Sequence, residues 1–181
     1  MLFPEKEILL KDGRTALLRT PREEDAEELL EYLRAVSGET EFLTRGPEET
    51  ETDPEKERAW VRGTRASPDS LMISCFLDGR IVGNCEINFS ARKKTAHRAT
   101  LGIALRREVW RLGIGSALFS EMIAAGRTRG VAFLELCCME ENARAIAFYE
   151  KFGFRTVSRL PDAFRLSDGR PCGELFMRLE L

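Results

Sequence analysis

The most constraining feature of this 181-residue chain is a pair of glycines in residues 110–118, which read WRLGIGSAL. The stretch follows a predicted strand, residues 100–105, and opens a predicted helix, residues 116–127. The first N–H groups of a helix have no intrahelical acceptor, and glycine leaves them uncovered by a side chain. Because the helix dipole adds positive charge there, this turn is predicted to bind a phosphate or pyrophosphate.

The better-known phosphate loops do not fit this turn. A Walker loop requires Gly-Lys-Ser/Thr, whereas Gly115 is followed by Ser116 and Ala117. A dinucleotide-binding turn requires a third small residue where this chain has Leu118, and an acidic residue at a strand end about 20 positions further on. Glu135 lies inside its predicted strand, so neither class of loop is predicted.

Charge is unevenly distributed along the chain, although the net charge is only -2. Residues 21–60 hold 14 acidic and 5 basic side chains, and residues 88–130 hold 9 basic and 2 acidic ones. The basic block surrounds the glycine turn and suits an anionic ligand, although both blocks could also be solvated faces. Nucleic acid is not an expected partner, because no basic helix or cluster of stacking aromatics accompanies the charge.

Composition indicates one soluble globular domain over residues 1–181, with 43% hydrophobic and 32% charged residues. No apolar run reaches the roughly 18 residues of a membrane span, and the N-terminus has no signal pattern, so a cytoplasmic protein is expected. Five cysteines without a C-x-x-C pair and a single histidine predict no metal site, only reduced, buried thiols. Adjacent Cys137 and Cys138 should point to opposite faces of a strand.

Hydrophobic periodicity and turn signals predict a single α/β order of elements. Thr20 is expected to cap the first helix, with Pro21 in its first turn and Gly38 at its end. The predicted strands are residues 8–10, 16–19, 71–77, 81–89, 97–105, 131–139, 154–158 with a continuation at 163–166, and 174–181; the predicted helices are residues 21–37, 54–65, 116–127 and 142–152, with a loop at 39–51.

Residues 142–154, NARAIAFYEKFGF, are the second informative stretch. RLGIGSAL followed, across one strand, by N-x-x-A-x-x-F-Y-x-K-x-G-F resembles the GNAT family of acyl-CoA-dependent N-acetyltransferases. The resemblance implies an α/β (in some schemes α+β) fold: a mixed, mostly antiparallel twisted sheet with helices on both faces. It also implies acetyl-CoA as the acyl donor, and no metal. One departure is Trp110, which stands where the family motif usually has Gln or Arg.

The resemblance also implies which residues hold the cofactor. A strand end is expected to pair with the pantetheine arm through its main chain, in a slot where it splays from the strand at 131–139. Asn142 is expected to hydrogen-bond the pantetheine, although asparagine is also a favoured N-cap. The expected cofactor-binding residues are Ile103, Ala104, Leu105, Arg111, Leu112, Gly113, Ile114, Gly115, Ser116 and Asn142.

Acetyl transfer requires a group that donates a proton to the leaving thiolate and a base that removes a proton from the amine. Tyr149 is the predicted general acid, because tyrosine, with a pKa near ~10, stays protonated at neutral pH. Glu135, Glu86 and then His97 are the candidate general bases, and a water relay is an alternative. Both glutamates lie within apolar strands, where a carboxylate needs either a role or an ion-pair partner such as arginine.

The predicted function is therefore transfer of an acetyl group from acetyl-CoA to a primary amine by direct attack. The acceptor is a small molecule or a protein amine. The resemblance implies that the acidic segment 39–57 lies on the acceptor side, and its charge favours a cationic acceptor. A different class of function, a non-catalytic acyl-CoA-binding or regulatory module on the same fold, remains as the alternative. A homodimer is common in the family and stays open, and no membrane partner is expected.

Overall fold

The computed structural model describes all residues 1–181, and its centre is an eight-stranded sheet in the order β1-β2-β3-β4-β5-β6-β8-β7. All neighbouring strands are antiparallel except β5 and β6, which are parallel. This confirms the predicted mixed, mostly antiparallel sheet. The strands are β1 (Lys6–Leu9), β2 (Thr15–Arg19), β3 (Ser70–Leu77), β4 (Arg80–Phe89), β5 (Arg98–Leu105), β6 (Phe133–Met139), β7 (Arg155–Arg165) and β8 (Pro171–Glu180).

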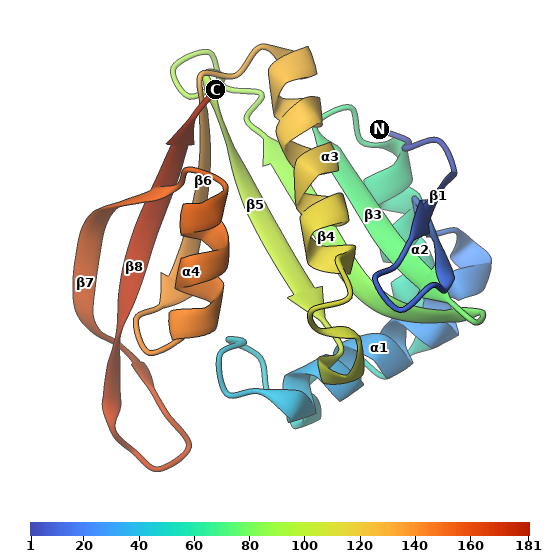
Figure 1. Ribbon diagram of the computed structural model, residues 1–181, viewed down its shortest axis with the longest axis horizontal. Coiled ribbons are helices and arrows are strands. Elements are labelled where there is room, and N and C mark those ends of the chain that lie inside the picture. Colours follow the sequence, from blue (N-terminus) through green and yellow to red (C-terminus); the bar gives the residue numbers. More distant parts are fainter.

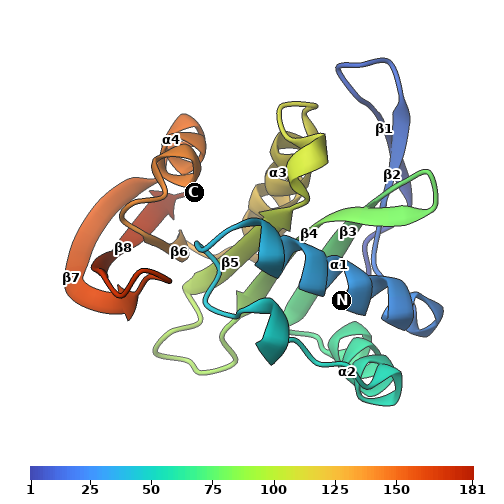
Figure 2. The ribbon, with the colours of Figure 1, turned by 90° about the horizontal axis from the view of Figure 1, so that it is seen from below.

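Four α-helices cover the two faces of the sheet, as Figures 1 and 2 show. One face carries α1 (Ala26–Glu39) and α2 (Pro54–Ala66), and the other carries α3 (Ile114–Arg129) and α4 (Ala143–Lys151). Short 3-10 helices occupy Glu23–Asp25, Pro47–Glu49 and Arg107–Val109. The helices therefore divide the molecule into an α1/α2 face and an α3/α4 face.

The predicted start of the first helix is wrong. Thr20 does not cap it; its Oγ1 accepts a hydrogen bond from the Phe3 N–H at 2.8 Å. The N-cap of α1 is Asp25, which makes no side-chain capping bond to the helix; its carboxylate instead accepts from the Arg22 N–H at the start of the preceding 3-10 turn. The hydroxyl that the local pattern assigns to a cap is used instead to hold the N-terminal segment against the start of the helix.

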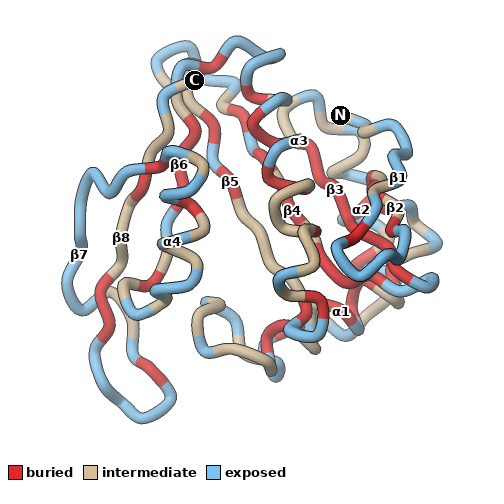
Figure 3. Tube along the Cα trace, in the orientation of Figure 1, coloured by how far each residue is buried: buried red, intermediate tan, exposed pale blue.

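The core has a large cluster on the α3/α4 face and a smaller one on the α1/α2 face. The larger cluster includes Phe119, Met122, Leu134 and Tyr149, and the smaller includes Tyr32 and Met72. Figure 3 shows buried residues concentrated along the central strands, while β7 at the sheet edge is mostly exposed. Both faces of the central strands are thus covered, and the dense apolar strand predicted at 131–139 is confirmed as β6.

The five cysteines are unpaired, as predicted, but they are not all buried. Cys75, Cys85 and Cys172 are buried, Cys138 is half-buried and Cys137 is exposed. Alternation along β6 explains the difference between Cys137 and Cys138, since neighbouring strand residues face opposite sides.

Among the helices, none combines the length and apolar character that crossing a bilayer requires.

Candidate active site

The only parallel pair of strands separates halfway along its length. β5 and β6 pair from Arg98 and Phe133 to Thr100 and Glu135, and no pairing follows. Beyond that point β5 stays bonded to β4, and β6 to β8. Figure 1 shows the two strands diverging toward the end where α3 and α4 begin. The predicted splay is therefore present, and it opens at the N-termini of two helices.

The glycine turn forms a concave row of N–H groups at the start of α3. Arg111 has φ +68 and Gly113 has φ +100, on either side of Leu112. Alternating left-handed and right-handed conformations turn successive N–H groups toward one side, as in other anion-binding nests. The first helical hydrogen bond joins the Ala117 N–H to the Gly113 carbonyl at 3.0 Å. The turn therefore presents its amides at the end of the gap between β5 and β6.

Five of the six amides assigned to the pyrophosphate make no hydrogen bond within the chain. Leu112 is the exception, because its N–H lies 3.5 Å from the Val109 carbonyl, and its own carbonyl accepts from the Lys11 N–H. A Cβ on Gly113 would meet no atom within 4 Å, so open space lies in front of the row. The free amides belong to Arg111, Gly113, Ile114, Gly115 and Ser116. This arrangement fits a multiply charged phosphate ligand.

The register of β5 separates the three residues expected to pair with pantetheine. The Arg106 N–H donates to the Val82 carbonyl on β4, so alternation turns Ala104 toward β4 and Ile103 and Leu105 toward the gap. The Leu105 carbonyl accepts from the Trp110 indole N–H at 3.1 Å. The Ala104 carbonyl accepts from the Tyr32 hydroxyl at 2.7 Å. Ile103 therefore has the unpaired main-chain groups that face the gap.

The start of α4 was predicted correctly. The Asn142 side chain accepts from the Ala145 N–H at 3.1 Å, which makes it the N-cap. At the other end, Gly153 has φ +91, the left-handed conformation expected after the last turn. The capping role uses the Asn142 carbonyl oxygen and leaves its NH₂ group without a partner in the chain.

Tyr149 projects from α4 into the large core cluster, where it is buried. Its ring lies 5.6 Å from that of Phe119 and 5.7 Å from that of Phe148, between centroids. Burial, chiefly, raises the pKa of its hydroxyl, and the nearby Cys138 and Cys85 thiols add to the effect. The hydroxyl therefore stays protonated across the physiological range, as a proton donor requires.

Glu135 is buried and held by two arginines. Its Oε1 accepts from Arg178 at 2.7 and 3.0 Å, and its Oε2 lies 3.4 Å from Arg98. Its side chain is only 4% exposed. The ion-pair alternative predicted for this glutamate is thus confirmed, and the three side chains join β5, β6 and β8 at the point where the gap begins.

Glu86 differs from Glu135 because no arginine contacts it. Its side chain and those of Trp60, Thr64 and Asn88 line a cavity of 500 Å³ between α2 and strands β3 and β4. Burial raises the pKa of the Glu86 carboxyl, and the Asn88 side chain partly opposes that shift. A Cβ on Gly102 of β5 would lie 3.7 Å from Glu86 Oε1. The carboxylate therefore lies one strand away from the gap, on the α1/α2 face.

His97 lies at the opposite end of β5 from the glycine turn, and its ring packs edge-on against Phe133 at 6.1 Å.

Two residues near the site were not predicted from the sequence. The exposed indole of Trp60 lines the Glu86 cavity, and the guanidinium of Arg144 lies 3.0 Å from the centre of the Trp110 ring. An aromatic residue on an otherwise polar helix face was the available signal for Trp60. Nothing local links Arg144 to Trp110.

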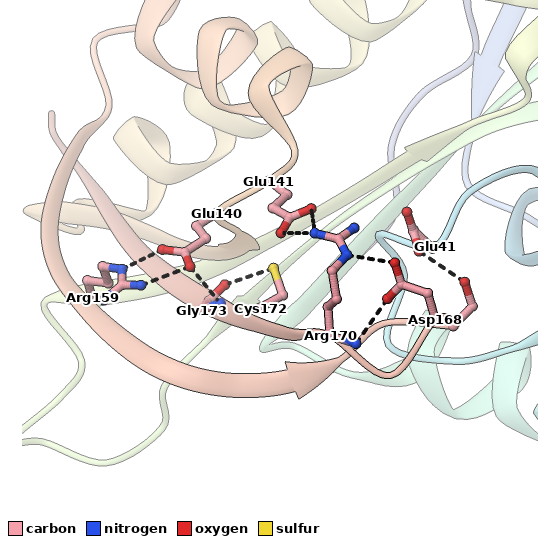
Figure 4. Close-up of polar contacts among 9 residues, drawn as sticks. Glu41, Glu140, Glu141, Arg159, Asp168, Arg170, Cys172 and Gly173 are labelled. Atoms are coloured by element: carbon pink, nitrogen blue, oxygen red, sulfur yellow. Dashed lines mark hydrogen bonds and ion pairs between the residues drawn. The ribbon is translucent and has the colours of Figure 1, made fainter.

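The β7–β8 hairpin is tied to β6 and to the α1–α2 loop by polar contacts, drawn in Figure 4. Glu140 accepts from Arg159 and from the Gly173 N–H, and Arg170 pairs with Glu141 at 3.1 Å. Ser167 donates to Glu41 of the α1–α2 loop at 3.3 Å. Phe42 of that loop packs against Met139, Leu166 and Cys172. The loop and the hairpin therefore meet near the end of β6.

The fold is that of an acyl-CoA-dependent acyltransferase. Three features define it: a parallel strand pair that splays apart, a row of free amides at a helix start, and a buried tyrosine on the next helix. Residues 27–154 match the family model described as the acetyltransferase (GNAT) family. That match covers well over half of the chain, so the protein belongs to the GNAT family, as its motifs predict.

Individual relatives agree with this placement. The chain is 34% identical over 96 residues to an L-amino acid N-acetyltransferase of Escherichia coli (strain K12), covering 52% of this chain and 59% of that protein. It is 36% identical over 83 residues to the [ribosomal protein bS18]-alanine N-acetyltransferase of the same strain, covering 45% of this chain and 56% of that protein. The chain thus matches less than two thirds of the length of either relative.

Among solved structures, an acetyltransferase of the GNAT family from Streptococcus pneumoniae superposes with a TM-score of 0.85 at 26% identity. The superposition covers 92% of this chain and 99% of the other. The similarity therefore extends beyond the shared motifs to the whole sheet and its helices.

Proposed function

We propose that this chain is an acetyl-CoA-dependent N-acetyltransferase acting on a primary amine. The observation that carries the proposal is the gap between β5 and β6, which has free amides at one end, Tyr149 on the α3/α4 face and Glu86 on the α1/α2 face. Acetyl-CoA supplies a thioester carbonyl that an uncharged amine can attack, with a thiolate as the leaving group. The residues of the chain must bind acetyl-CoA and the amine, orient them relative to one another, and transfer two protons.

The glycine turn and the end of β5 bind the cofactor. The free amides of Arg111 and of residues 113–116 hold the pyrophosphate, aided by the positive end of the α3 dipole. The main chain of Ile103 and the free NH₂ of Asn142 then orient the pantetheine arm along the gap. These groups are fixed by the ends of β5, α3 and α4, so they lose little entropy when they bind the ligand.

Proton transfer is divided between the two faces of the sheet. We place Glu86 before Glu135 as general base, because both Glu135 oxygens are engaged with arginines while Glu86 borders an open cavity. The Glu86 carboxylate takes the proton from the acceptor nitrogen. The Tyr149 hydroxyl donates the proton that the departing thiolate requires. A base on one face and an acid on the other suits an amine that enters from the α1/α2 face.

The acceptor is proposed to be an amine carried by an amino acid or a polypeptide. The two curated relatives are named for L-amino acids and for an alanine of a ribosomal protein. The cavity beside Glu86 supports this size of ligand, since 500 Å³ holds a side chain and its backbone. The acidic segment 39–57 lies on the same face and favours an acceptor with net positive charge.

Release of free CoA thiol tests the proposal. Acetyl-CoA is incubated with the protein and, separately, with L-amino acids, peptides beginning with alanine, and polyamines. We expect thiol release that depends on one amine class, and a fall in kcat of about 10²- to 10⁴-fold for Tyr149→Phe. If acetyl-CoA raises the melting temperature but no amine yields thiol, the chain is the non-catalytic module instead.

A further inference from the structure

Arg144 in the first turn of α4 is a cation without a counter-charge. The Arg144 side chain forms no ion pair or hydrogen bond within the chain. The guanidinium of its neighbour Arg107 donates to the Glu39 carbonyl, and the Arg107 main-chain N–H donates to the Glu39 carboxylate. Burial lowers the pKa of the Arg144 guanidinium from its usual value, and the charge on Arg107 lowers it further. Two arginines thus crowd together with no carboxylate beside Arg144, an arrangement that an anion would relieve.

Trp110 fixes the position of this guanidinium. The Arg144 Cζ lies 3.0 Å from the centre of the Trp110 ring, and the indole N–H donates to the Leu105 carbonyl at 3.1 Å. The indole is thereby held against the end of β5, and the arginine is held against the indole. Stacking on an aromatic face stabilises a cation without neutralising it, and leaves the N–H groups of the guanidinium free to donate.

The stacked pair lies at the same end of the gap as the free amides. Trp110 immediately precedes Arg111 of the glycine turn. The start of α3 also contacts α4, since a Cβ on Gly115 would lie 3.6 Å from the Phe148 ring, one turn after Arg144. Both helices begin at this end in Figure 1. Within residues 112–116 no side chain carries a charge, so Arg111 is the one cationic residue of the turn.

We propose that Arg144 is a phosphate-binding residue of the acyl-CoA site and that Trp110 is the positioning residue that holds it there. The inference rests on the proposed function, because it assumes that the ligand is a CoA ester. A planar guanidinium presents paired N–H groups that match phosphate oxygens, and one already held in place loses little freedom on binding. The stacked pair thus adds a second cationic side chain, held in a fixed position, beside the turn that carries Arg111.

Calorimetric titration with acetyl-CoA and with acetyl-pantetheine, which lacks the phosphates, tests this assignment. We expect Arg144→Ala to weaken acetyl-CoA binding about 10- to 100-fold, the usual scale of a hydrogen bond to a charged group, and to leave acetyl-pantetheine binding unchanged. Trp110→Ala should have the same selective effect, and Trp110→Phe, which keeps a ring for stacking, a smaller one. Arg34→Ala is the matched control, because Arg34 is an exposed arginine of α1 on the other face.

Fluorescence gives a second readout that does not depend on activity. Trp60 and Trp110 are the two tryptophans of the chain, so Trp60→Phe leaves Trp110 as the single reporter. Acetyl-CoA should change its emission, and the added change Arg144→Ala should abolish that response. Wild-type affinity for acetyl-CoA in Arg144→Ala would overturn the assignment of Arg144. Failure of the unaltered protein to bind acetyl-CoA would instead contradict the proposed function.

Discussion

The structure constrains the two glycines of the turn to different degrees. Gly113 has φ +100, a conformation that costs an L-residue about 1–2 kcal/mol, while a Cβ there would meet open space. Gly115 lies within the first turn of α3, and a Cβ there would lie at ordinary contact distance from Leu105 and Phe148. Gly113 therefore keeps the backbone turned and the ligand side clear, whereas the packing around Gly115 leaves room for an alanine.

Gly113→Ala should lose acetyl-CoA binding as well as about 1–2 kcal/mol of unfolding free energy, because the methyl group strains the backbone and projects in front of the amides. Gly130→Ala is a matched control. Gly130 has φ +74 at the other end of the same helix, also with open space around a Cβ, so it carries the strain alone. Calorimetry and urea unfolding separate the two effects. Equal cofactor affinity in both variants would contradict the phosphate role of the turn.

The Glu86 carboxyl should be visible in the pH dependence of kcat/KM. Burial raises its pKa above the ordinary 4.5, so activity should fall as the pH drops through that raised value and protonates the base. Glu86→Gln should lower kcat by about 10²- to 10³-fold and remove this acid limb. The comparison is made in steady-state assays from acid to neutral pH.

Glu135→Gln serves as the control for that experiment. It removes the negative charge that Arg178 and Arg98 surround, so the unfolding free energy should fall by about 1–2 kcal/mol while the acid limb stays in place. If Glu135→Gln abolished the limb and Glu86→Gln left it intact, the order of the two candidate bases would be reversed.

At the scale of elements, one aromatic cluster positions α4 relative to α3. Phe119 of α3 is fully buried, and its ring lies 5.1 to 5.6 Å from those of Phe148, Tyr149, Phe152 and Phe154. Because α4 begins at Asn142 and carries Tyr149, the positions of both residues depend on this aromatic cluster.

Phe119→Ala should lower the unfolding free energy by about 3–5 kcal/mol, the usual cost of removing a buried aromatic ring. It should also raise KM for acetyl-CoA, since α4 loses its main contact with α3. Phe119→Leu retains much of the volume and should cost markedly less on both measures. Thermal unfolding and steady-state kinetics give the two readouts, and a loss of stability with unchanged kinetics would show that the cluster does not position the site.

At the scale of the whole molecule, local signals predicted most of the fold. The Asn142 cap and the hairpin that joins the strands predicted at 71–77 and 81–89 sit where the sequence places them, because caps and tight turns depend on a few adjacent residues. The misplaced cap at Thr20 reflects a partner 17 residues away. Arg178, which holds Glu135, is 43 residues distant, and Arg144 meets Trp110 only after the chain has folded. Such partners leave no local pattern.

The pH dependence of the unfolding free energy should also show the effect of the buried Glu57. Its side chain is 6% exposed, and its Oε1 has no hydrogen-bond partner, so burial raises the pKa of the carboxyl. A raised folded-state pKa means that the native state holds the proton more tightly, and stability is lost as the pH rises from the ordinary glutamate range through the raised value.

Glu57→Gln should therefore raise the unfolding free energy at pH 7 by about 1 kcal/mol, and the gain should vanish in acid. Urea unfolding at several pH values measures this difference. Glu24→Gln, at an exposed position, makes the same change of charge and should have little effect. A gain that persisted unchanged in acid would contradict the explanation based on burial of the charge.

The central claim is that an acetyl group passes directly from acetyl-CoA to an acceptor amine. The most direct measurement follows isotope-labelled acetyl from acetyl-CoA to the amino group of a peptide or amino acid, quantified by mass spectrometry against thiol release in the same reaction. We expect one labelled amide for each thiol released. Thiol release without a labelled amine, or binding of acetyl-CoA with neither product, would contradict it.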